Sequence, residues 1–421
     1  EENDYIYYTV VLIVVAGVFS TLFIPETRVI DFYISTIDWA VIFFLISMFI
    51  IVEVLQENKI LDEIARRIVL KYQQKPRRLF YIICIISTLM ASIIEDISIS
   101  MIFTPILIVA TRKLKIKAAP YLLGMTICIN IAATLLPFGS AQNILISNEL
   151  NLNIIWFIVY LGPYFLIALS LTLFLLDRIT LRKDLIFCKS NVCVTYEEEM
   201  NVLLENKNVT KKDLFKNLIS LGVFILLLIF IPALYLAGIL GALIFVLINP
   251  VKKRDGTKGI SLSYYLSKID YKLIYFFMCL FIFVGLMQAN GTIAFIESLI
   301  ENISAANEFL LAVIILIITS ILSGFLDNTP VTIIFIPVIK ILVGLPEFYS
   351  FPIIIAFILG INLGGNFLPQ GSTADLMTLE ISRDYNVDDL SYKRLFKVGG
   401  LFAFIHIILG IGYLAILVFL I

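Results

Sequence analysis

Long apolar runs constrain this chain more than any other feature of its sequence. They cover roughly 16–25 residues each and are separated by short charged segments. A helix needs about 20 apolar residues to cross the ~30 Å hydrocarbon core of a bilayer. Of the 421 residues, 60% are hydrophobic and 15% are charged, whereas soluble domains are about 45–50% apolar and about 25% charged. The sequence therefore predicts an all-α polytopic protein of the plasma (cytoplasmic) membrane, with the lipid bilayer as its partner.

The apolar runs predict about nine to ten full crossings. We place them at residues 6–24, 39–55, 118–148, 154–176, 218–234, 235–249, 271–290, 351–378 and 398–421. Proline and glycine interrupt two of these, 118–148 and 351–378, which we interpret as broken helices. Segments 79–111 and 311–342 each contain two apolar halves of roughly 13–16 residues, too short for two comfortable crossings. We interpret each as a re-entrant hairpin.

Lysine and arginine are concentrated in alternate segments of the chain. The basic segments are 56–78, 112–117, 177–214, 250–270 and 381–397. Segments 151–153, 291–308 and 343–350 contain neither residue, and 25–38 contains only Arg28. Basic loops are retained on the cytoplasmic side of membranes. We therefore expect the basic segments and the N-terminus to be cytoplasmic, provided that each hairpin leaves and re-enters on one side.

A shift of 232 residues superposes two halves of the sequence. "EDISISMIFTPIL" (95–107) then falls on "DNTPVTIIFIPVI" (327–339), and "INIAATLLPFGSAQNILI" (129–146) falls on "INLGGNFLPQGSTADLMT" (361–378). The crossing at 39–55 falls on 271–287 at the same shift. Five predicted crossings separate the two copies, and an odd number inverts the second copy. Inverted repeats with broken helices are typical of secondary transporters.

The repeat and the charge pattern divide the chain into five parts. They are an N-terminal span with an external loop (1–38), a first repeat (39–176), a cytoplasmic linker (177–217), two connecting spans with a basic loop (218–270) and a second, inverted repeat (271–421).

Polar residues occupy the tip of each hairpin. A carboxylate at membrane depth is costly and marks an ion or proton pathway by default. Asp327 suits Na⁺ or a proton, with Asn328 and Thr329 as neutral ligands, whereas Glu95 and Asp96 are too close for both to ionise cheaply. We expect a coupling-ion site with Na⁺ near Asp327 and Asn328. Its residues are Glu95, Asp96, Ser98, Asp327, Asn328 and Thr329.

The two broken helices supply the expected solute site. A helix break exposes backbone groups, and half-helix N-termini attract anions. Glycine permits a tight turn there, and small polar side chains add ligand atoms without bulk. The residues expected to contact the solute are Asn130, Pro137, Gly139, Ser140, Asn143, Asn362, Asn366, Gly371, Ser372 and Thr373.

Other polar residues in the apolar segments are given structural roles. His406, the single histidine, is interpreted as a packing residue, with proton relay as the alternative. Glu53 lies near a helix end, where its side chain can reach the interface. The amphipathic stretches 57–72 and 292–303 are expected to be interfacial helices that flank the hairpins.

The tip and break motifs together resemble the ion transporter superfamily, in particular the arsenite-permease and NhaD-type antiporter group with its citrate-transporter-like domain. "LDNTPV" (326–331) and "INLGGNFLPQGSTA" (361–374) match its pattern well. "NIAATLLPFGSAQN" (130–143) matches more loosely, and the first tip "EDIS" departs from the expected Asn-rich tip. The resemblance covers roughly residues 39–421 and implies an elevator-like or rocking carrier that forms a homodimer. It does not select the substrate.

Two functions follow. The first is a Na⁺- or H⁺-coupled secondary transporter of a small inorganic anion or metalloid oxyanion. The second is a Na⁺/H⁺ antiporter that uses Asp327 and Asp96 as cation carriers. No nucleotide-binding, metal or nucleophile–base motif is visible in the sequence, so we expect no enzymatic activity, no cofactor beyond the coupling ion and no nucleic-acid partner.

Overall fold

Helices make up almost all of the described chain. The structure is a computed structural model that describes residues 5–72, 74–182, 184, 209–252, 258–295, 307–344 and 350–420. The two short strands, β1 (Val251–Lys252) and β2 (Lys258–Gly259), pair antiparallel in the basic loop 250–270. Six described helices are long and apolar enough to cross a membrane, and shorter apolar helices accompany them. The predicted all-α membrane fold is confirmed.

The helices of the first copy follow the predicted segments. They are α3 (Trp39–Glu57), α4 (Ile60–Tyr72), α5 (Pro76–Ala91), α6 (Asp96–Lys113), α7 (Ala119–Ala132), α8 (Ala141–Glu149), α9 (Ile154–Tyr160) and α10 (Gly162–Leu176). The connection between α7 and α8 is the predicted helix break. The crossing 154–176 is divided at Leu161, because Pro163 begins a new helix there.

The second copy repeats this order. Its elements are α16 (Tyr271–Ala289), α18 (Glu308–Phe325), α19 (Asn328–Gly344), α20 (Ser350–Gly364), the short turn η3 (Pro369–Gly371), α21 (Thr373–Asp384) and α22 (Tyr392–Leu420). The elements outside the two copies are α1 (Tyr5–Phe23), η1 (Pro25–Arg28), α2 (Ile30–Ser35), α13 (Lys211–Phe230), α14 (Leu234–Ile248) and α15 (Leu262–Leu266).

The shift of 232 residues holds for the helix ends as well as for the motifs. Asp38 caps α3 by accepting hydrogen bonds from two backbone N–H groups, and Asp270 caps α16 in the same way. At the other end, Lys59 and Gly291 both have positive φ angles, 53° and 80°. Equivalent residues therefore begin and end equivalent helices, which supports the predicted repeat.

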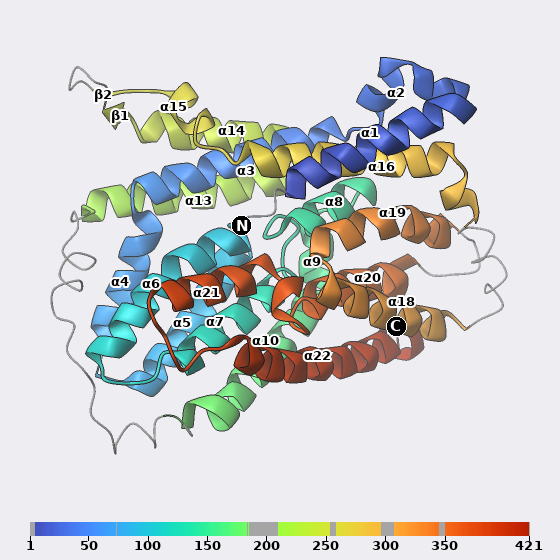
Figure 1. The fold of residues 1–421 in the computed structure, drawn as a ribbon. Helices are drawn as coiled ribbons and strands as arrows, with labels where there is room; N and C mark the ends of the chain where they lie inside the picture. The colour runs from blue at the N-terminus through green and yellow to red at the C-terminus, as the bar shows by residue number, and fades with distance from the viewer. Residues whose placement is uncertain are drawn as a thin grey trace.

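The molecule has two layers. Helices α1, α3, α13, α14 and α16 pack together along the upper side of Figure 1, and the hairpins and broken helices lie below them. The lower layer contains the most buried helix, α7, of which all residues from Ala119 to Ala132 are buried. The α5–α6 and α18–α19 pairs pack against α7 and α20 respectively. The core thus surrounds the broken helices.

Ion pairs bring the basic segments to one side of the molecule. Arg77 pairs with Asp177 at 2.6 Å. Asp184 accepts from both Lys117, at 3.1 Å, and Arg394. Lys268 pairs with Glu57 and with Glu53, the latter at 3.5 Å. These ion pairs link all five basic segments to one another, as the sequence predicts.

Asp38, at the end of the segment 25–38, and residues just before the segments 151–153 and 343–350 meet elsewhere. Lys340, near the end of α19, pairs with Glu149 at the end of α8, and Asn148 donates to Asp38 at the start of α3. The residues around 38, 149 and 340 are therefore neighbours, and both ends of the α5–α6 pair lie at the basic side. The shared side of the basic segments is observed, and their cytoplasmic location stays a prediction.

Some predicted boundaries were wrong. Helix α13 begins at Lys211, seven residues before the predicted crossing, and α22 begins at Tyr392, six residues before it. In both, polar first turns extend an apolar helix, which hydropathy does not detect. The predicted linker is helical at 177–182 and from Lys211, and most of its centre lies outside the described residues. Of the predicted interfacial helix 292–303, residues 296–303 lie outside the described part.

Candidate functional site

Each hairpin tip packs against a helix break. A Cβ added at Gly139 would lie 2.6 Å from the Ala91 carbonyl oxygen and 2.8 Å from that of Ser92. At the equivalent Gly371, a Cβ would lie 2.7 Å from the Ser323 carbonyl oxygen. Only glycine allows so close an approach of backbone to backbone. The two copies therefore build the same junction from equivalent residues.

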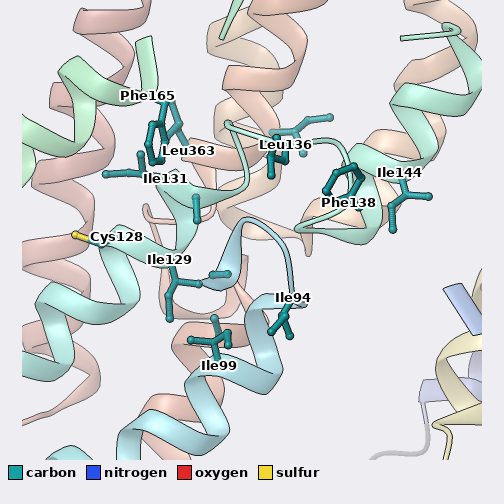
Figure 2. Packing of buried hydrophobic residues seen from close by; sticks show 14 of the residues in the cluster. Ile94, Ile99, Cys128, Ile129, Ile131, Leu136, Phe138, Ile144, Phe165 and Leu363 are labelled. Carbon is teal, nitrogen blue, oxygen red and sulfur yellow. The ribbon is translucent and has the colours of Figure 1, made fainter. Parts of the chain in front are cut away.

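Apolar side chains enclose the first junction. Figure 2 shows Ile94 and Ile99 at the tip between α5 and α6, next to Ile129 of α7. Leu136 and Phe138 lie in the connection that leads to α8, and Phe138 is 2% exposed. This packing buries the backbone of the break, as membrane depth requires.

Buried amides join the two copies at the centre. Asn130 donates from Nδ2 to Asn366 Oδ1 at 2.9 Å and accepts at Oδ1 from Ser372 Oγ at 2.9 Å. Asn362, the repeat partner of Asn130, donates to Asn143 Oδ1 at 2.8 Å. It accepts from Gln142 Nε2 at 2.9 Å. These four bonds all run between the copies.

Asn328 extends this network from the second tip. Its neighbours fix the orientation of its amide. The nitrogen donates to the carbonyl oxygens of Ile361, at 3.1 Å, and Gly371, at 3.0 Å, and the oxygen accepts from Gln142 Nε2 at 3.3 Å. The Asn328 nitrogen is therefore held by backbone carbonyls, and its oxygen accepts one hydrogen bond.

The carboxylates lie around the tips rather than inside the amide network. Asp96 Oδ1 accepts from the Ile97 N–H at 2.8 Å, and Asp327 Oδ1 accepts from the Asn328 N–H at 2.9 Å. Both side chains sit at the first turn of a helix, where a negative charge is favoured. Asp96 interacts electrostatically with Asp327 and with Glu95. The two tips thus bring three half-buried acids into one electrostatic neighbourhood.

The remaining predicted site residues fall in the same tips and breaks. Pro137, Ser98 and Thr329 are buried, and Thr373 begins α21. Ser140, the residue before α8, is buried with no hydrogen-bond partner for its hydroxyl, and Asn366 Nδ2 likewise has none. Ser100 Oγ, Ser320 Oγ and Asp375 Oδ1 are also buried without a partner among the described residues.

Sequence reasoning missed Gln142 and Asp375. Gln142 bonds to Asn362 and Asn328, and Asp375 is 1% exposed with Oδ1 unpartnered. A signal for Asp375 was available, because the shift of 232 places it on Asn143. Among the described residues, no group of three or more His, Cys, Asp or Glu side chains is arranged to hold a metal ion.

His406 and Glu53 lie away from the junctions. His406 is fully buried between α10 and α22, where its Nε2 lies 2.7 Å from Thr172 Oγ1 and its backbone oxygen accepts from Tyr164 at 2.8 Å. These contacts agree with a packing role. Glu53 lies 3.5 Å from Lys268 at the basic side.

These features define a membrane transporter built from two inverted copies with broken helices. The chain belongs to the citrate transporter family, CitMHS, whose model matches residues 5–266 and 256–421. This membership confirms the citrate-transporter-like part of the resemblance.

Two relatives and one solved structure are similar to this chain. The chain is 26% identical over 358 residues to a 46 kDa membrane protein of Mycobacterium leprae, covering 82% of this chain and 79% of that one. It is 24% identical over 419 residues to an uncharacterised transporter of Mycobacterium tuberculosis, covering 96% and 92%. The YdaH transporter of Alcanivorax borkumensis has the same fold, with a TM-score of 0.65, 11% identity and coverage of 91% and 86%.

Proposed function

We propose that this transporter moves a small inorganic anion or metalloid oxyanion by alternating access, coupled to Na⁺ or H⁺. The observation that carries the proposal is a pair of unpartnered buried donors, Ser140 Oγ in the first helix break and Asn366 Nδ2 in the second. A buried donor without an acceptor costs about 1–3 kcal/mol. An anion would remove that cost.

The helix ends favour the same ligand. α8 and α21 both begin at the junctions, and the serine before each helix makes no capping bond to it. Their first N–H groups and the partial positive charge of each helix N-terminus are suited to a negative solute. The acids at the tips would take the coupling ion, and the hairpins would enter the membrane from opposite sides.

A Na⁺/H⁺ antiporter is the second candidate. The observation in its favour is the electrostatic interaction between Asp96 and Asp327, which come from opposite copies. Like charges held this close compete for one proton or cation. In this function the same two acids would exchange Na⁺ and H⁺ without a further solute.

Thermal stabilisation of the purified protein tests both candidates. A ligand that binds only the folded state raises its Tm by mass action. The panel is Na⁺, Li⁺, arsenite, phosphate, sulfate, silicic acid and citrate, each at two pH values. Stabilisation by an anion or metalloid only when Na⁺ or acid is present supports coupled transport. Stabilisation by Na⁺ alone, abolished by acid and by Asp327→Asn, supports the antiporter instead.

Two equivalent serines give a matched pair for locating the solute. Ser372→Ala leaves Asn130 Oδ1 without a donor, so we expect it to destabilise the protein by about 1–3 kcal/mol. Ser140→Ala removes a hydroxyl that has no partner. We expect unchanged basal stability and a weaker response to the solute. A full solute response in Ser140→Ala would contradict the placement of the solute at this junction.

A further inference from the structure

Two helix–helix contacts are equivalent under the repeat, but they carry different polar side chains. Helix α6 packs against α21 in one half, and α19 packs against α8 in the other. The shift of 232 places Asp96 on Asn328 and Asn143 on Asp375. One contact therefore carries two carboxylates where the other carries two amides.

The amide pair is complete without a charge. Asn143 Nδ2 donates to the carbonyl oxygens of Ala133 and Leu136, the latter at 3.3 Å, and its Oδ1 accepts from Asn362. Asn328 is likewise bonded to backbone carbonyls and to Gln142. A fully satisfied buried amide network rigidifies a core and has no need of a ligand.

The carboxylate pair is incomplete. Asp375 is 1% exposed, and its Oδ1 has no hydrogen-bond partner. It interacts electrostatically with Asp96, and the Thr126 hydroxyl of α7 lies beside it. One turn after Asp96, the Ser100 hydroxyl is also fully buried and unpartnered. Asp96 itself is half-buried. Two neighbouring carboxylates of which one is fully buried do not readily both remain ionised unless a cation lies with them.

A polar seam leads from this pair to the basic side. Helix α6 continues with Ser100 and Thr104, and α21 continues with Thr378 and Ser382, all buried. Thr104 and Thr378 approach to 3.4 Å between their hydroxyl oxygens. The equivalents in the other copy are Thr332, Ile336, Ile146 and Leu150, so that contact is mostly apolar. Hydroxyls follow the carboxylate pair toward one side only.

We infer that Asp96 and Asp375, with the hydroxyls of Thr126 and Ser100, form a binding site for one monovalent cation, Na⁺, which a proton replaces. The site lies at the α6–α21 contact, and the polar seam of buried hydroxyls runs from it toward the basic side. The titratable groups that face it are Glu95, on the same tip, and Asp327, on the other tip; Asp270 interacts with Glu95. The inference rests on the proposed function, because the ion held here would be its coupling ion.

Sodium-dependent stability of the purified full-length protein tests the site. Tm is measured against NaCl at pH 6 and pH 8, with choline chloride holding the ionic strength constant. We expect Na⁺ to raise Tm in the wild type, more at pH 8 than at pH 6. Asp375→Asn should lose this rise. Asp384→Asn, an exposed acid on the same helix, should keep it in full.

Proton release is the second readout. Na⁺ added to weakly buffered protein should release protons from the wild type and Asp384→Asn, and fewer from Asp375→Asn. The double variant Asp96→Asn with Asp375→Asn reproduces the amide pair of the other copy. We expect it to fold without any response to Na⁺, which keeps the test open if the single variant fails to fold.

The outcomes separate this site from the transport proposal. A sodium and proton response that persists in Asp375→Asn, or in the double variant, overturns the site, and so does a wild type without any response. The solute panel is scored independently on the same preparations. If a solute stabilises the wild type but the Na⁺ test fails, the transport proposal stands and the cation site does not. If the Na⁺ test succeeds but no solute stabilises the protein, the cation site stands and the solute-transport proposal does not.

Discussion

Gly139 and Gly371 set the distance between each hairpin tip and the broken helix beside it. At either position a Cβ would meet backbone carbonyl oxygens of the tip at less than 3 Å. Backbone atoms of a packed tip cannot move aside as the end of a flexible side chain can. These glycines are therefore required by the approach of two backbones and not by a turn, since neither has a positive φ.

We expect Gly139→Ala and Gly371→Ala each to destabilise the protein by about 1–3 kcal/mol, the usual cost of overpacking. Gly222→Ala on α13 is the control, because a Cβ there has no neighbour within 4 Å. It should be neutral or stabilising by up to about 1 kcal/mol, since alanine favours helix. Denaturation in detergent measures all three. Wild-type stability in Gly139→Ala would show that the tip is loosely packed.

At the same scale, the sequence predicted the amides and glycines but not how they pair. Asn130, Asn143, Asn362 and Asn366 were identified because polar residues stand out in apolar helices. Gln142 was missed because it lies beside a break already rich in polar residues, and its bonds reach into the other copy, to Asn362, which is 220 positions away, and to Asn328. Contacts that cross between copies depend on how the copies pack, which no local pattern encodes.

Helix α4 shows how an element outside the apolar runs is attached. The predicted amphipathic stretch is a helix, and it packs against α5 and α6. Its Glu63 side chain is 5% exposed and pairs with Arg66 at 2.7 Å and Arg67 at 2.6 Å. Burial acts to raise the pKa of Glu63, but the hydrogen bonds and charges of the two arginines outweigh it and hold the pKa below its usual value.

The two ion pairs of Glu63 predict how the stability of the protein depends on pH. A carboxyl with a lowered folded-state pKa stabilises the protein above the unfolded-state value, 4.5, and loses that contribution as the pH falls through the folded value. We expect Glu63→Gln to have a lower Tm than the wild type at neutral pH. The difference should shrink below pH 4.5. Asp384→Asn, an exposed acid, serves as control, and a difference that is independent of pH would contradict the role of the ion pairs.

The element boundaries were predicted where hydropathy changes sharply. Helix α3 and helix α16 were recovered at their starts because an aspartate cap precedes each apolar run. The starts of α13 and α22 were missed because charged first turns look like loop in a hydropathy pattern. Helical continuation through such turns depends on packing and capping, as with the Thr210 cap of α13.

The whole molecule is organised by which side its charges occupy. Ion pairs gather the basic segments on one side, and the pair Lys340–Glu149 links the segments of the other. The odd number of crossings between the copies and this charge separation are independent arguments for inversion. Both were visible in the sequence, because sidedness follows from where lysine and arginine lie along the chain.

Thiol labelling in intact cells tests the orientation. In a background lacking the five native cysteines, we expect Glu26→Cys to react with a membrane-impermeant maleimide from outside. Lys113→Cys should react only after the membrane is opened. Both positions are exposed. The opposite result would place the basic side outside, and the α6–α21 seam would then lead toward the outside.

The crosswise bonds of the central amides have a consequence for how this family varies. Asn130 depends on Asn366 and Ser372, and Asn362 depends on Asn143 and Gln142. We therefore expect a substitution in one copy to be compensated in the other, at a partner that is not its repeat equivalent. Across aligned relatives, position 130 should covary with 366 and 372 rather than with 362. The two halves are similar in sequence, yet we expect their shared interior to vary as a single unit.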